Sequence, residues 1–66
     1  MIAPSLVRPG EIFRVICNGT VEVELAGKKY SGMNTVLVRA PAAPGKYTMV
    51  VSCGGIKYIK TLIVGR

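Results

Sequence analysis

The sequence predicts an all-β domain, a small sandwich or barrel of six or seven short antiparallel strands. Turn-forming pairs such as Pro9-Gly10 and Gly54-Gly55 recur at short intervals along the 66 residues. The segments between them are rich in β-branched residues and alternate between apolar and polar side chains. No segment has the helical period, and no apolar run approaches the ~18 residues of a membrane span. A chain of this length forms one domain, here residues 1–66.

Each strand segment is defined by its alternation and by the turns on either side. Residues 2–7 are expected at a sheet edge, because Pro4 has no amide hydrogen to donate to an interior ladder. The other predicted segments are residues 11–17, 20–25, 35–39, 47–53 and 56–64. Within each segment the more apolar face is assigned to the core. The predicted core comprises Phe13, Val15, Val21, Val23, Leu25, Val36, Val38, Tyr47, Met49, Val51, Tyr58 and Leu62.

The pair Gly54-Gly55 predicts a tight hairpin between the last two strands. A two-residue loop there matches the apolar faces of both strands, except that Lys60 falls opposite Met49. We expect either the aliphatic stem of Lys60 to extend outward at a sheet edge, or a bulge to intervene.

The pair Asn18-Gly19 is a strong hairpin signal, but its flanking residues argue against a two-residue loop. Such a loop would place Val15 opposite Glu22 and mix an apolar face with an acidic one. We therefore expect either an extra loop residue or two strands in opposing sheets, as in a Greek key.

The two cysteines, Cys17 and Cys53, fall on the apolar faces of different predicted strands. This placement suits a buried disulfide between sheets, whose loop of ~36 residues would stabilise the domain by roughly 3–4 kcal/mol. The alternative is two separate buried thiols, since free cysteine is itself often buried. We favour the bridge. Chains of this size also tend to need a disulfide, a metal or oligomerisation besides their core.

Two proline-glycine motifs carry a family resemblance. Residues 4–11 read P-S-L-V-R-P-G-E, and residues 40–51 read A-P-A-A-P-G-K-Y-T-M-V-V. They are similar to the "P-x-x-V-x-P-G-E" and "A-P-x-x-P-G-x-Y-T-V-x-V" runs of small immunoglobulin-like β-sandwich modules from bacterial and archaeal surface and secreted proteins. The resemblance implies an immunoglobulin-like Greek-key sandwich, with Tyr47 packed inward and its hydroxyl bonded back to the corner backbone.

The sequence also departs from immunoglobulin domains proper. It contains no Trp, and Cys53 follows Tyr47 by six residues instead of two. The bridge is therefore expected near one end of the sandwich. The resemblance implies a fold and not a particular function.

Catalytic and metal-binding residues are scarce. The chain has no His and no Asp, and Glu22 and Glu24 are expected to be solvated on an outward strand face near Arg14. Two Cys without any His cannot fill a zinc site, and Met49 is expected in the core. We therefore expect no enzyme activity, no cofactor and no bound metal.

The charge is strongly positive and unevenly distributed. Nine Lys and Arg against three Glu give a net charge of +6, and every acid lies within the first 24 residues. This asymmetry favours an anionic partner, although an apolar chain also needs net charge for solubility. The candidate contacts for an anion or a nucleic acid are Lys28, Lys29, Lys57 and Lys60, with Tyr30 as the one aromatic lacking an expected inward role. A small basic nucleic-acid-binding β-protein is therefore the alternative function.

The preferred function is a non-enzymatic structural or protein-interaction module that associates with copies of itself through sheet edges or an apolar face. A short sandwich leaves edge strands whose unpaired backbone groups invite strand addition from another chain. The candidate edge residues are Leu62, Ile63 and Val64, where the last strand is apolar on both faces.

The compartment follows from the thiol chemistry. Residues 1–4 lack the basic and apolar regions of a secretory signal, so we expect a cytosolic protein or a mature or excised segment of a longer one. A disulfide favours an exported or cell-surface protein, or the cytoplasm of a hyperthermophile. Asn18-Gly19-Thr20 matches the N-glycosylation sequon, which matters only in an exported protein.

Overall fold

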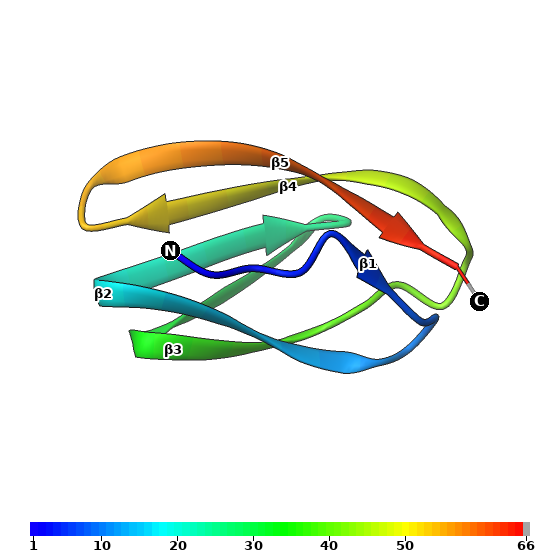
Figure 1. The fold of residues 1–66 in the computed structure, drawn as a ribbon, viewed down its shortest axis with the longest axis horizontal. Helices are drawn as coiled ribbons and strands as arrows, with labels where there is room; N and C mark the ends of the chain where they lie inside the picture. The colour runs from blue at the N-terminus through cyan, green and yellow to red at the C-terminus, as the bar shows by residue number, and fades with distance from the viewer. Residues whose placement is uncertain (66) are drawn as a thin grey trace.

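The computed structural model describes residues 1–65, which form an all-β fold as predicted. The strands are β1 (Leu6–Val7), β2 (Ile12–Leu25), β3 (Lys28–Arg39), β4 (Gly45–Cys53) and β5 (Ile56–Val64) (Figure 1). They form one sheet of order β1-β5-β4-β2-β3. The β1–β5 pair is parallel and the other pairs are antiparallel. No helix that could cross a membrane occurs among the described residues.

The strand count differs from the prediction of six or seven short antiparallel strands. Within residues 1–65 there are five strands, and the sheet is mixed because β1 runs parallel to β5. The predicted segments 11–17 and 20–25 are continuous in β2, which has 14 residues. Similarly, β3 has 12 residues and joins residues 28–33, which carry no predicted strand, to the predicted segment 35–39. Turn signals within these strands mark bends and not strand ends.

The bend occurs at the same level in β2 and β3. Their pairing is interrupted between Ile16 and Thr20 of β2. Gly19 has φ 119° and Asn34 of β3 has φ 68°, both in the left-handed region that lets the chain turn sharply. The side-chain oxygen of Asn34 accepts a hydrogen bond from the backbone nitrogen of Gly19 at 3.1 Å. The expectation that Asn18-Gly19 is not a two-residue hairpin is therefore confirmed.

Gly32 makes the bend sterically possible, and this gives a testable prediction. A Cβ atom at Gly32 would collide with the backbone carbonyl oxygen of Thr35. We expect Gly32→Ala to lower the free energy of unfolding, measured by urea denaturation, by about 1–2 kcal/mol, because backbone must shift to relieve the overlap. The control is Gly65→Ala, whose Cβ would meet nothing within 4 Å. Equal effects of the two substitutions would contradict the bend geometry.

The bend divides the sheet into two layers, which Figure 1 shows one above the other. We call residues 12–16 of β2 with residues 35–39 of β3 the narrow layer. The broad layer consists of residues 20–25 of β2, residues 28–33 of β3, β4 and β5. Only the second half of β2 also pairs with β4, through Val21 to Glu24, which leaves the narrow layer with few strands.

The N-terminal segment crosses between the layers on one side. Ile2 exchanges two backbone hydrogen bonds of 2.8 Å with Ile16 in the narrow layer. Farther along, the carbonyl oxygen of Ser5 accepts a hydrogen bond of 2.9 Å from the nitrogen of Ile63 in β5. The predicted edge strand 2–7 is thereby reduced to an isolated bridge and the two residues of β1.

This crossing overturns the prediction of a free edge at Leu62, Ile63 and Val64. The side chains of Leu62 and Val64 are buried, and the backbone of Ile63 and Val64 pairs with Leu6 and Val7. The prediction was wrong because the residues that cover this edge, Leu6 and Val7, lie near the other end of the chain.

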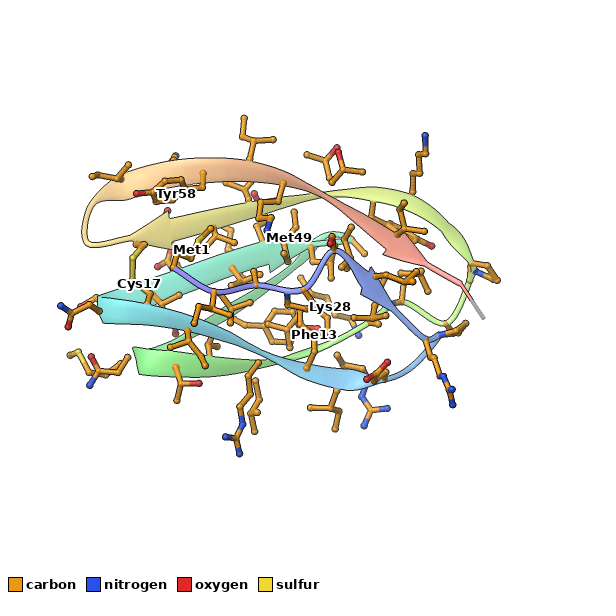
Figure 2. All side chains as sticks on the ribbon, viewed as in Figure 1. Met1, Phe13, Cys17, Lys28, Met49 and Tyr58 are labelled. Atoms are coloured by element: carbon orange, nitrogen blue, oxygen red, sulfur yellow. A yellow bond between two sulfur atoms is a disulfide. The ribbon has the colours of Figure 1, made fainter. Side chains whose placement is uncertain are left out.

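The core lies between the layers, where Figure 2 shows Phe13 and Met49. Ten of the twelve predicted core residues are buried, the exceptions being half-buried Tyr47 and Tyr58, which is 40% exposed. Tyr58 is exposed because β1 pairs only with Ile63 and Val64, so that no strand within residues 1–65 lies on the outer side of the start of β5. The core also includes Val7, Cys17, Ala40 and Val64.

The disulfide between Cys17 and Cys53 is present, as predicted, with a Cα–Cα distance of 5.9 Å. It lies at the end of the layers where β2 bends (Figure 2). The cross-link joins the end of the first half of β2 to the last residue of β4. It therefore links the narrow layer to the broad layer.

The discordant Lys60 is accommodated without a bulge. It stays in register opposite Met49, and its side chain is half-buried. The Nζ atom donates a hydrogen bond to the carbonyl oxygen of Ala3 at 3.3 Å. Of the two expected solutions the bulge is therefore absent, and the ammonium group instead finds its acceptor in the N-terminal segment.

Candidate interaction surfaces

The four predicted anion contacts lie in three different environments. Lys29 and Lys57 are exposed on the outer face of the broad layer, where Lys29 is opposite Glu24. Lys28 is opposite buried Leu25 and so lies on the inward side of its strand. Lys60 is directed to the N-terminal segment. The structure therefore does not bring the four lysines together into one cationic patch.

The outer face of the broad layer has a shallow hollow of mixed charge. It is about 100 Å³ in volume and is lined by Glu22, Val23, Glu24, Lys29, Val50, Ser52 and Lys57. Across the strands, the two carboxylates of β2 lie between the two lysines. Lys29 of β3 is opposite Glu24 on one side, and on the other side Ser52 of β4 lies between Glu22 and Lys57. The carboxylates offset the lysines, so this surface does not favour a polyanion.

The outer face of the narrow layer exposes several large aliphatic side chains. The outward residues of β2 here are Ile12, Arg14 and Ile16, and the β3 residues opposite them are Arg39, Leu37 and Thr35 in that order. Leu37 is 57% exposed, and Ile12 and Ile16 are exposed on either side of it. Exposed Ile2 extends this surface beyond Ile16. We call Ile2, Ile12, Ile16 and Leu37 the narrow-layer patch.

The open edge of the molecule is β3. It is the last strand of the sheet and pairs only with β2, so the backbone groups on its other side have no strand partner within residues 1–65. The direction of these groups follows from two contacts. The backbone nitrogen of Ala40 donates a hydrogen bond of 2.7 Å to the carbonyl oxygen of Glu11, so the backbone groups of Ala40 point toward β2. The backbone groups of Ile16 bond to Ile2, on the side of β2 that faces away from β3. Since backbone groups point to alternate sides along an antiparallel strand, those of Thr35, Leu37 and Arg39 point away from β2.

A groove opens beside this edge, between the two halves of β3. It is about 240 Å³ in volume and is lined by Gly10, Leu25, Ala26, Lys28, Tyr30, Arg39, Ala40, Pro41 and Ala42. Tyr30, expected to have no inward role, is half-buried and packs against the core. The groove therefore combines an apolar floor with two cations.

Sequence reasoning did not single out the narrow-layer patch or the β3 edge. A signal for the patch was present, because residues 11–17 read E-I-F-R-V-I-C and are apolar on both faces. Strand order, which makes β3 the edge, has no comparable local signal.

Comparison with known proteins adds no relative. No protein-family model, no curated protein sequence and no solved structure matches the chain.

Proposed function

We propose that this protein is a non-enzymatic structural or protein-interaction module that associates with copies of itself through the narrow-layer patch. The observation that carries the proposal is the concentration of exposed aliphatic side chains on that face. Four aliphatic side chains gather there beside Arg14, Thr35 and Arg39, whereas on the outer face of the broad layer Ile59 has Lys57 and Thr61 as its neighbours on the same face. An apolar patch on a small domain is the usual mark of an association surface.

The expected association is weak. Burying a largely exposed Ile or Leu contributes on the order of 1–2 kcal/mol, while immobilising two proteins costs at least several kcal/mol. Four such side chains per copy therefore support a Kd on the order of 100 µM. Arg14 lies within the patch, and the net charge of each copy is +6, so that electrostatic repulsion opposes association.

Repulsion of this kind gives self-association a characteristic salt dependence. Added salt screens the like charges and strengthens contact between apolar surfaces, so the dimer should become tighter as salt rises. Nucleic-acid binding, the alternative function, has the opposite sign because phosphate contacts release counterions. The sign of the salt dependence therefore separates the two functions.

We expect the weight-average mass in sedimentation equilibrium to rise above 7.0 kDa with protein concentration, and more steeply at ~0.5 M than at ~0.05 M NaCl. Leu37→Thr replaces the aliphatic side chain with a β-branched residue that suits a strand, and should raise Kd at least about tenfold. Ile59→Thr is the matched control on the broad layer, where the side chain is 76% exposed, and should leave Kd unchanged. A monomer at ~1 mM protein in high salt, or equal effects of both substitutions, would contradict the proposal.

We further propose that the fold belongs to the immunoglobulin-like sandwiches. If the halves of β2 and β3 are counted separately, the chain has seven strand segments, and it changes layers within β2, within β3 and between β3 and β4. Seven segments with such layer changes support the proposal. Support also comes from Tyr47, whose hydroxyl donates a hydrogen bond of 2.6 Å to the carbonyl oxygen of Ala43. This contact matches the corner tyrosine that the motif resemblance implies.

A further inference from the structure

We propose that the groove beside β3 binds an extended, acidic and apolar segment of a partner protein, which adds as a strand to residues 35–39. This inference goes beyond self-association, because it uses a different surface and a different partner. It rests on the free backbone groups of β3, the apolar floor of the groove and the sign of its charges.

The backbone groups for strand addition are already oriented. Those of Thr35, Leu37 and Arg39 point away from β2, and β3 has no neighbour on that side within the described residues. An incoming strand that pairs with them extends the narrow layer by one strand. Main-chain hydrogen bonds then supply affinity, while the side-chain environment sets specificity.

The groove specifies the side chains of the partner. Its floor includes Leu25 and Ala40, which are nearly fully buried, and the ring of half-buried Tyr30. Alternate residues of an added strand point inward, where they lie over this floor and cover it. Apolar side chains therefore suit the inward positions.

The charges around the groove select an anionic segment. Lys28 and Arg39 line it, and none of its lining residues is acidic. One Nη atom of Arg39 donates to the carbonyl oxygen of Gly10 at 3.5 Å, which holds the guanidinium at the groove wall. A carboxylate on the partner would lie close to both cations.

A second copy of this chain is a poor occupant of the same edge. All charged residues of β3 are cations, namely Lys28, Lys29 and Arg39, so pairing of two β3 strands would bring two positively charged strands together. This is why we assign the edge to an acidic partner and self-association to the narrow-layer patch.

The test uses a capped nine-residue peptide in which Glu alternates with Val, titrated into the ¹⁵N-labelled full chain at ~50 mM NaCl. We expect saturable shifts of the Leu37, Arg39 and Tyr30 amide signals. Lys28→Gln and Arg39→Gln should each weaken binding about fivefold. Lys29→Gln and Lys57→Gln are the matched controls on the broad outer face and should change binding less than twofold.

Two further peptides separate strand addition from simple charge attraction. A version N-methylated at alternate residues keeps the charge but cannot complete the ladder, and it should lose at least tenfold in affinity. A version with Lys in place of Glu should not bind. The proposal is overturned by the absence of saturable binding at ~1 mM peptide, by equal binding of the N-methylated form, or by shifts confined to β5.

The same experiments distinguish this proposal from the proposed function. Leu37→Thr is expected to weaken self-association but to retain peptide binding, because the strand contact at Leu37 is made by its backbone. Weaker peptide binding in Lys28→Gln with unchanged self-association supports the assignment of the two activities to different surfaces. A single-stranded oligonucleotide that binds the groove more tightly than the acidic peptide would assign it to nucleic acid instead.

Discussion

The double variant Cys17→Ala/Cys53→Ala is expected to melt roughly 15–25 °C below the wild type, which corresponds to a loss of roughly 3–4 kcal/mol. The bridge spans 36 residues of sequence, so its removal releases a long loop in the unfolded chain. In the folded state it joins the two layers at the bend of β2. A domain of this size has little stability in reserve, so the loss is large relative to the total.

Thermal unfolding followed by circular dichroism, with and without reductant, measures this effect. Reductant should lower the melting temperature of the wild type to that of the double variant and leave the double variant unchanged. A wild type whose melting temperature does not respond to complete reduction, verified by intact mass, would show that the layers hold together without the bridge.

The substitution Leu62→Ala is expected to lower the free energy of unfolding by about 2–5 kcal/mol. Leu62 is 0% exposed and lies opposite Tyr47 on the inward face of β5. Truncating it removes apolar contacts and leaves a void that the surrounding strands fill only in part. The effect should therefore resemble that of a core residue in a larger protein.

Ile59→Ala on the same strand is the control. Its side chain is 76% exposed on the outward face, so the same kind of truncation should cost less than about 1 kcal/mol. Urea denaturation of the two variants gives the comparison directly. If Ile59→Ala were as damaging as Leu62→Ala, the assignment of inward and outward faces of β5 would be reversed.

The core and the disulfide were predictable because they depend on local alternation. Apolar residues at every second position, as in Val21, Val23 and Leu25, define one face whatever the strand order is. Both cysteines fall on such faces, and they meet in the structure. Alternation also showed that Asn18-Gly19 does not form a simple hairpin.

The strand count and the folding of the sheet into two layers were not predictable in the same way. Whether a turn signal ends a strand or bends it depends on the neighbouring strand, as the contact between Asn34 and Gly19 shows. The position of residues 2–7 depends on pairing with Ile16 and with β5, which are distant in sequence. Tyr58 is exposed for a related reason, since among the described residues β1 covers only Ile63 and Val64 of β5.

The candidate surfaces were the least predictable part. Which strand forms an open edge depends on the strand order. In this order the backbone of Ile63 pairs with β1, and β3 is left as the open edge. The four candidate lysines share a charge but not a surface. Lys28 and Lys29 lie on opposite faces of β3, and Lys60 is bonded to Ala3 in the N-terminal segment. The narrow-layer patch was visible in the sequence only as a strand with two apolar faces.

Amide hydrogen exchange along residues 35–39 tests the central claim, that the sheet folds over and leaves β3 as its open edge. The account predicts protected amides at Val36 and Val38, which face β2, and fast exchange at Leu37 and Arg39, which face solvent. Equal protection of all four amides in the monomer would show that another strand already covers this edge. Fast exchange at all four would show that β3 does not pair with β2 in the narrow layer.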